Sequence, residues 1–306
     1  MEAPSASLSG TFLIGGDLPV HRLGYGTMRL VGEGAWGEPA DADEARRVLR
    51  RAVDRGVTLI DTADAYGPEI AERLIAEALP GGSKGAYPPG LVIATKGGIT
   101  RQGPARTEYV GRAGYLIQCV EMSLRRLKLE RIDLYQLHRI DPRTPLEESL
   151  GALRQMQEQG KIRHIGLSEV TPSQIEEAQK IVKIVTVQNR YSLADRRHEE
   201  TLAWCEQRGI GFMPWYPMAA GKLLKPEHPL AQTLARIAAR HSATTAQISL
   251  AWLLQRSPVM LPIPGTSKVA HLEENIAAAG LRLSELEWIE LERTTAVQPQ
   301  KQEKNL

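Results

Sequence analysis

The stretch Val57–Gly67, VTLIDTADAYG, decides the fold. An apolar run ends there in Asp61, and Tyr66 follows five residues later. Apolar runs that do not alternate with polar residues are typical of parallel strands buried on both faces. Helical spacing of apolar residues flanks the run, at Asp43–Arg55 before it and at Glu69–Leu79 after it. The stretch therefore predicts a strand, set between two helices, whose end delivers polar side chains.

The same alternation of strand and helix signals runs along the whole chain. The predicted strands are His21–Gly26, Thr58–Asp61, Leu91–Thr95, Ile132–Leu137, Ile162–Gly166, Ile184–Gln188, Ile210–Pro214 and Val259–Pro262. The further predicted helices are Pro145–Gln159, Pro172–Ile181, His198–Arg208, Leu230–Arg240, Ala246–Gln255, His271–Ala279 and Glu285–Arg293. Eight strand–helix units predict a (β/α)8 TIM barrel of the α/β class, a single domain over residues 1–306 with a polar tail at about 298–306. The alternative is a doubly wound sheet, which normally carries a G-x-G-x-x-G fingerprint after its first strand; we expect this chain to lack one.

Four polar side chains follow three of the predicted strands: Asp61 and Tyr66, then Lys96 in LVIATKGG and His138 in IDLYQLHRID. In a barrel they would meet at one mouth, and together they fit the protonation of a carbonyl oxygen. A phenol, with an ordinary pKa of about 10, is a poor acid at neutral pH unless a nearby ammonium stabilises the phenolate. A carboxylate would hold that ammonium, and the histidine would orient the carbonyl oxygen. Ordinary structural roles compete, such as an aspartate that caps a helix or a histidine tied to Asp141.

Six motifs succeed one another in unbroken order between Leu23 and Ala279: LIDTADAYG, IATKGG, LYQLHRID, IGLSEV, VQNRYS and PIPGTSK. In this order they resemble the strand-end motifs of the aldo-keto reductases. The resemblance implies a catalytic tetrad of Asp61, Tyr66, Lys96 and His138, with Tyr66 as the general acid in reduction. It also implies a short hairpin at about 10–20 that plugs the barrel, and NADP(H) bound across the barrel top.

The resemblance further assigns the cofactor contacts. Ser168 and Gln188 match positions that hold the nicotinamide carboxamide, and Tyr216 matches the aromatic residue that stacks on its ring. The matches for the pyrophosphate and the adenosine phosphate are Gly221, Lys222, Leu223, Gly265, Thr266, Ser267 and Lys268, and those for the adenine are Glu274 and Asn275. His271 stands where many relatives carry an arginine against the 2′-phosphate. Because a neutral histidine makes no bidentate phosphate pair, the expected preference for NADPH over NADH is modest.

The composition argues against several other classes of partner. Hydrophobic residues make up 42% of the 306 residues, charged residues 24%, and the net charge is +2, as in ordinary globular proteins. We interpret the pairs of adjacent arginines as parts of solvated helix faces, so no nucleic-acid partner is expected. Cys119 and Cys205 show neither metal-site spacing nor a disulfide framework, so no metal is expected. Without a leader-like start or a membrane-spanning apolar run, we expect a cytoplasmic protein with no membrane partner. The family default is a monomer.

Two loops, Arg29–Ala40 and Gly97–Gly114, should rim the mouth, and their small apolar content suggests functional or mobile segments. Trp36, with Trp215, is predicted to line a pocket for a small-molecule carbonyl substrate. The segment PIPGTSKVAHLEEN is most similar to a bacterial subgroup that includes pyridoxal reductases. The main alternative function is a nicotinamide-sensing regulatory subunit with little turnover, and a barrel isomerase or lyase ranks third.

Overall fold

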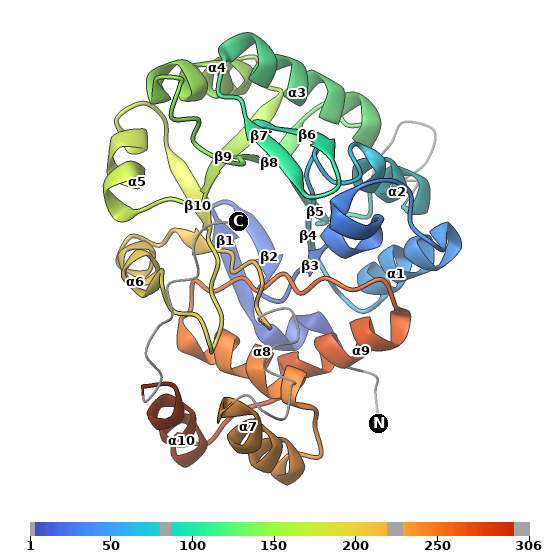
Figure 1. Ribbon diagram of the computed structural model, residues 1–306, viewed down its shortest axis with the longest axis vertical. Coiled ribbons are helices and arrows are strands. Elements are labelled where there is room, and N and C mark those ends of the chain that lie inside the picture. The colour runs from blue at the N-terminus through green and yellow to red at the C-terminus, as the bar shows by residue number, and fades with distance from the viewer. Residues whose placement is uncertain (1–3, 80–86, 219–228, 297–306) are drawn as a thin grey trace.

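The computed structural model describes residues 4–79, 87–218 and 229–296. Its centre is a parallel sheet with the strand order β11-β10-β9-β8-β5-β4-β3, and helices surround it (Figure 1). The strands are β3 (Tyr25–Gly26), β4 (Leu59–Asp61), β5 (Val92–Gly97), β8 (Ile132–Leu137), β9 (Ile162–Ser168), β10 (Ile184–Gln188) and β11 (Gly211–Phe212).

The segment 259–264 closes this sheet into a barrel. On one side Leu261 N donates a hydrogen bond to the Phe212 carbonyl at 2.8 Å, and on the other Gly24 N donates to the Pro262 carbonyl at 2.9 Å. The predicted strand Val259–Pro262 is not a regular strand, because a proline within it has no N–H to donate. The two sets of bonds nevertheless connect β11 to β3. The (β/α)8 barrel predicted from the sequence is confirmed.

The helices follow the predicted alternation. They are α1 (Ala42–Asp54), α2 (Ile70–Ala78), α3 (Ala113–Leu127), α4 (Leu146–Glu158), α5 (Pro172–Gln179), α6 (Glu199–Gln207), α7 (Pro229–Arg240), α8 (Thr245–Arg256), α9 (Val269–Ala277) and α10 (Glu285–Ala296). Helix α3 is missing from the predicted set, although Leu116, Val120 and Leu124 stand at helical spacing and are buried. Within the described ranges no helix has the length and apolar character needed to span a membrane.

An antiparallel hairpin, β1 (Thr11–Ile14) and β2 (Leu18–His21), crosses one end of the barrel (Figure 1). Its side chains Ile14, Leu18 and Val20 are buried in one cluster with residues of the barrel strands such as Leu59 and Leu134. Among the described residues these contacts fill the barrel interior at that end, so we expect a ligand to enter at the other end, where the strands finish.

The loops at that other end are more regular than expected. Residues 97–114 contain a second hairpin, β6 (Ile99–Gly103) and β7 (Arg106–Tyr109), whose residues Arg101 and Tyr109 line the cavity at this end of the barrel, as a functional loop would. The loop 29–40 contains the short 3-10 turns η2 (Met28–Leu30) and η3 (Glu33–Ala35). It also holds the letters G-x-G-x-x-G, as GEGAWG at 32–37, which the sequence reading overlooked. The segment forms a turn rather than the start of a helix, so it is not a dinucleotide fingerprint.

Candidate active site

Asp61, Tyr66 and Lys96 meet at the carboxyl ends of β4 and β5. The Lys96 Nζ donates to Asp61 Oδ2 at 2.7 Å, to the Thr62 carbonyl at 2.8 Å and to the Tyr66 hydroxyl at 3.2 Å. The strand register explains this meeting. Asp61 pairs with Ala94, and Lys96 lies two residues further along β5, so their side chains point to the same face. All three polar side chains are buried.

The Asp61 carboxylate also accepts two amide donors that the sequence reading did not place beside it. Gln188 Nε2 donates to Oδ1 at 2.8 Å and Gln136 Nε2 donates to the same oxygen at 3.3 Å. Such donors replace hydrogen bonds to water that a buried carboxylate has lost. Gln136 had a usable signal, because it is a polar residue in the apolar strand IDLYQL and pairs directly with Lys96 in the sheet.

Burial sets the electrostatics of the tyrosine and the lysine. Burial raises the pKa of Tyr66 above its ordinary value, and the Lys96 ammonium opposes this rise without cancelling it. Burial alone would lower the pKa of Lys96, but Asp61 and Tyr66 outweigh it and keep that pKa raised. Lys96 therefore stays charged and Tyr66 stays protonated at neutral pH. The ammonium thus lowers the phenol pKa, as expected from the sequence, but burial has the larger effect.

His138 lies edge-on to Tyr66, with ring centroids 6.0 Å apart and an interplanar angle of 81°. Burial lowers the pKa of His138 well below its ordinary value, and the positive charges of Lys96, Arg139 and Arg101 lower it further, so the ring is neutral. Its Nδ1 is buried and has no hydrogen-bond partner among the described residues. Asp141, the alternative partner, instead accepts bonds from the groups around it at residues 111, 143 and 144.

A second buried acid group lies next to the tetrad. Glu72 accepts hydrogen bonds from the Thr95 hydroxyl and from Arg126 Nε, each at 2.6 Å. Asp64, in the turn that leads to Tyr66, has an Oδ1 atom with no partner among the described residues. Burial and the charge of Glu72 raise the pKa of Asp64 to about 7. The turn before the tyrosine therefore holds a carboxyl group whose pKa is raised into the neutral range.

A cavity of about 430 Å³ opens at this end of the barrel, where Tyr66 and His138 form part of its wall. The wall also contains Ser168, Gln188, Tyr216 and Gly265 from the predicted cofactor set. Its aromatic residues besides Tyr66 and Tyr216 are Tyr109 and Trp215. The prediction for Trp36 is not supported: Trp36 is absent from the described wall, and its side chain is 38% exposed beside a bridge to Gly67.

The side chains of Ser168 and Gln188 fit a carboxamide. Because Asp61 accepts hydrogen bonds only, it fixes the NH₂ of Gln188 toward itself, and the Gln188 carbonyl oxygen receives no bond from any described residue. Ser168 Oγ accepts a bond from Arg139 Nη1 at 2.9 Å, which leaves the Ser168 O–H to donate. One free acceptor beside one free donor matches the NH₂ and C=O of a nicotinamide carboxamide.

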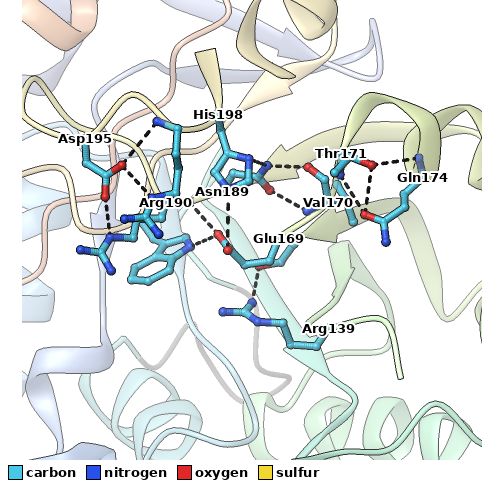
Figure 2. A network of polar contacts seen from close by, with 12 residues as sticks. Arg139, Glu169, Val170, Thr171, Gln174, Asn189, Arg190, Asp195 and His198 are labelled. Atoms are coloured by element: carbon cyan, nitrogen blue, oxygen red, sulfur yellow. Dashed lines mark hydrogen bonds and ion pairs between the residues drawn. The ribbon is translucent and has the colours of Figure 1, made fainter. Parts of the chain in front are cut away.

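Behind these two residues lies a network centred on Glu169 (Figure 2). Glu169 Oε1 accepts hydrogen bonds from Arg190 N at 2.7 Å and from Trp215 Nε1 at 2.6 Å, and Oε2 lies 3.8 Å from His198 Nε2. The Arg190 guanidinium in turn lies 4.8 Å from the centre of the Tyr216 ring. Glu169 therefore fixes the indole of Trp215 and the backbone of Arg190, and sequence reasoning missed it.

Burial would raise the pKa of Glu169, but His198, Arg139, Trp215 and the Arg190 amide together lower it to about 2. The residue itself adopts a left-handed backbone conformation, with φ of 55°. A non-glycine residue held at positive φ carries backbone strain, which the surrounding bonds must offset. The carboxylate is thus ionised at every physiological pH and locked in one orientation.

The predicted adenosine-phosphate residues lie at the start of α9. Ser267, Lys268 and His271 are exposed, while Thr266 and Asn275 are buried. The partly buried Glu274 accepts a hydrogen bond from the Thr244 hydroxyl at 2.7 Å. Gly265 is required by close approach, because a Cβ there would lie 2.7 Å from the Gly26 carbonyl oxygen. The predicted residues Gly221, Lys222 and Leu223 lie outside the described residues.

One acidic side chain at this helix start was not foreseen. Glu44 of α1 accepts a hydrogen bond from Val269 N, in the first turn of α9, at 3.1 Å. The same carboxylate is paired with Arg47 at 2.7 Å. A negative charge therefore already occupies part of the helix N-terminus that was predicted to face a 2′-phosphate.

Comparisons with known proteins identify the family. The aldo/keto reductase family model matches residues 22–295. An uncharacterised oxidoreductase of Schizosaccharomyces pombe is 48% identical over 283 residues, which cover 92% of this chain and 89% of that protein. Pyridoxine 4-dehydrogenase of Escherichia coli K12 is 43% identical over 283 residues, with coverages of 90% and 95%. A Klebsiella pneumoniae aldo/keto reductase solved with NADP and acetate superimposes with a TM-score of 0.78 at 29% identity, with coverages of 95% and 96%. The chain therefore belongs to the aldo-keto reductase family, whose members are oxidoreductases that use a nicotinamide cofactor.

Proposed function

We propose that this chain reduces aldehydes or ketones with NADPH and that Tyr66 is the general acid. The observation that carries the proposal is the bridging position of Lys96, whose Nζ bonds both Asp61 and the Tyr66 hydroxyl, two residues of the cavity wall. A buried ammonium in this position stabilises a phenolate, so the tyrosine is able to release its proton during the reaction.

Each residue has a defined part in the reduction. The nicotinamide cofactor, when bound, supplies the hydride, which no side chain is able to do. Tyr66 donates its hydroxyl proton to the carbonyl oxygen, and Lys96 stabilises the phenolate that remains. Asp61 keeps the lysine charged and in place. Neutral His138 donates a hydrogen bond to the same carbonyl oxygen and so fixes the orientation of the substrate. In the oxidation of an alcohol, the Tyr66 phenolate takes the proton back.

Pyridoxal is the proposed first substrate. The proposal rests on the 43% identity to pyridoxine 4-dehydrogenase and on the aromatic residues Tyr109 and Trp215 in the cavity wall. Aromatic side chains stack favourably on a flat ring and would restrict its orientation.

The test is turnover by the purified enzyme and by Tyr66→Phe. NADPH oxidation is followed with pyridoxal, aromatic aldehydes, methylglyoxal and simple ketones, and cofactor binding is followed by quenching of tryptophan fluorescence. Loss of one positioned acid lowers the rate by about 10²–10⁴, while cofactor affinity should stay unchanged. The control is Tyr87→Phe, which removes a hydroxyl that bonds the Leu127 carbonyl outside the cavity wall. Near-normal turnover by Tyr66→Phe would refute the assignment. Cofactor binding without turnover of any carbonyl would favour a regulatory binding subunit.

A further inference from the structure

The charged residues of the cavity wall are mostly cationic. Among the described residues, the wall contains Arg29, Arg101 and Arg139 but one carboxylate, that of Asp61, and Lys96 neutralises that carboxylate. Within the described part of the chain, no ion pair includes any of the three arginines, whereas surface arginines such as Arg143 pair with two acids. An unpaired guanidinium in a partly dry cavity loses hydration without gaining a counter-ion. The cavity therefore favours an anion.

Arg139 follows the end of β8, directly after His138, and is half-buried. Its Nη1 donates to the His138 carbonyl at 2.7 Å and to Ser168 Oγ at 2.9 Å, which fixes the plane of the guanidinium. Both acceptors are neutral, and the Nε and Nη2 donors make no hydrogen bond to a described residue. The Glu169 carboxylate interacts with the charge of Arg139 but does not form an ion pair with it. The group is thus oriented but still has donors to offer a ligand.

Arg101, also half-buried, reaches the wall from strand β6. Its Nε donates to the Ala65 carbonyl at 2.8 Å and its Nη1 to the Gly34 carbonyl at 3.1 Å. These acceptors are again neutral, and burial lowers the pKa of Arg101, an effect that Tyr66 opposes without cancelling it. The Nη2 donors have no partner among the described residues.

The charges of both guanidinium groups affect the pKa values of residues that are proposed to perform the reaction. The charges of Arg101 and Arg139 lower the pKa of His138, and Arg139 also lowers that of Tyr66. Because Tyr66, His138 and these two arginines line the same cavity, a small substrate whose carbonyl oxygen meets Tyr66 and His138 would have its other substituents close to the arginines. Arg29 differs, because it lies against Gly265 on the predicted cofactor side of the cavity.

We propose that the site selects carbonyl compounds that carry an anionic oxygen, a carboxylate or a phenolate, and that Arg101 and Arg139 bind that oxygen. The inference rests on the proposed function and names its substrate class. Pyridoxal belongs to this class, because a ring hydroxyl that ionises readily stands beside its aldehyde. A planar guanidinium with two free donors suits such an oxygen better than an ammonium does.

The first experiment compares matched aldehydes. Values of kcat/KM are measured for 4-carboxybenzaldehyde against its methyl ester, and for salicylaldehyde against 2-methoxybenzaldehyde, in the wild type, Arg101→Gln and Arg139→Gln. A lost charge-assisted hydrogen bond should lower kcat/KM for the anionic partner by about tenfold to a hundredfold, with a much smaller effect on the neutral partner. Arg139→Lys, which keeps the charge, should restore part of the loss. The control is Arg106→Gln in β7, whose guanidinium bonds only the Gln102 carbonyl among the described residues.

The proposal is supported if, in either aldehyde pair, the anionic compound has the higher kcat/KM and loses this advantage in the arginine variants. The pair that shows this result tells whether the site binds a carboxylate or a phenolate. Equal kcat/KM within both pairs, or an equal loss for both partners in the arginine variants, overturns it. The second experiment is calorimetric titration of benzoate and benzamide into the enzyme loaded with NADP⁺. Benzoate should bind more tightly than benzamide, and the difference should vanish in either glutamine variant. Because Arg139 contacts Ser168, cofactor dissociation constants are measured for every variant. If no aldehyde is reduced, the proposed function fails, while the benzoate titration still decides this inference.

Discussion

Replacing Lys96 with methionine should lower the rate of alcohol oxidation more than the rate of carbonyl reduction. The Lys96 ammonium lies 3.2 Å from the Tyr66 hydroxyl and lowers the pKa of the phenol. Two unit charges at that distance interact by about 5 kcal/mol at an effective dielectric constant of about 20, an upper bound of about four pKa units. Opposite charges this close usually shift a pKa by about one to three units. Without the ammonium, the pKa of Tyr66 should therefore rise by about one to four units.

The assay is alcohol oxidation and aldehyde reduction across the alkaline range. Oxidation needs the phenolate, so its rate at pH 8 should fall about tenfold for each unit of pKa gained, and its plateau should move to higher pH. Reduction at neutral pH should suffer less, because Tyr66 is protonated with or without the lysine. Since Lys96→Met leaves Asp61 buried and unpaired, which destabilises by about 3–5 kcal/mol, the double variant with Asp61→Asn serves as the control. An unchanged oxidation profile, or equal losses in both directions, would show that Lys96 does not act through the phenol.

Three further predictions concern residues around the tetrad. Glu44→Gln should increase the preference for NADPH over NADH, measured as a ratio of dissociation constants, because a carboxylate leaves the first turn of α9; an unchanged ratio would mean that the 2′-phosphate lies elsewhere. Glu169→Gln should lower the free energy of unfolding at pH 7 by about 3 kcal/mol, since the pKa falls from 4.5 to about 2 on folding. That difference should shrink as the pH falls from about 4.5 toward 2, and a constant difference in urea titrations across this range would contradict the assignment. Asp64→Asn should stabilise the protein by about 4 kcal/mol at pH 8 and hardly at all at pH 4, because the wild-type pKa rises from 3.8 to about 7 on folding; equal effects at both pH values would refute the buried, raised carboxyl.

The sequence predicted those features that depend on the residues of one strand alone. Asp61, Lys96 and His138 each lie at or just past the end of an apolar run, so the barrel topology alone brings them together. Glu169 and Gln136 were missed because their partners come from other strands and loops, and no local pattern encodes a cross-strand hydrogen bond. Arg101 enters the cavity only because residues 99–109 form a hairpin, which the glycine-rich and arginine-rich sequence did not reveal.

The proline-containing segment that closes the barrel has a consequence for the order of folding. Gly24 and Gly26 donate their amide hydrogens to the carbonyls of Pro262 and Pro264, at 2.9 and 3.4 Å. On this edge the first barrel strand therefore pairs with a segment that is synthesised late. Bringing together two segments so far apart in the sequence is slow. Until that segment is made, the edge of β3 that faces it stays unpaired, although the other barrel strands have already been synthesised. Amide hydrogen exchange at Gly24 should consequently report the closing of the barrel itself, separately from the formation of its individual strands.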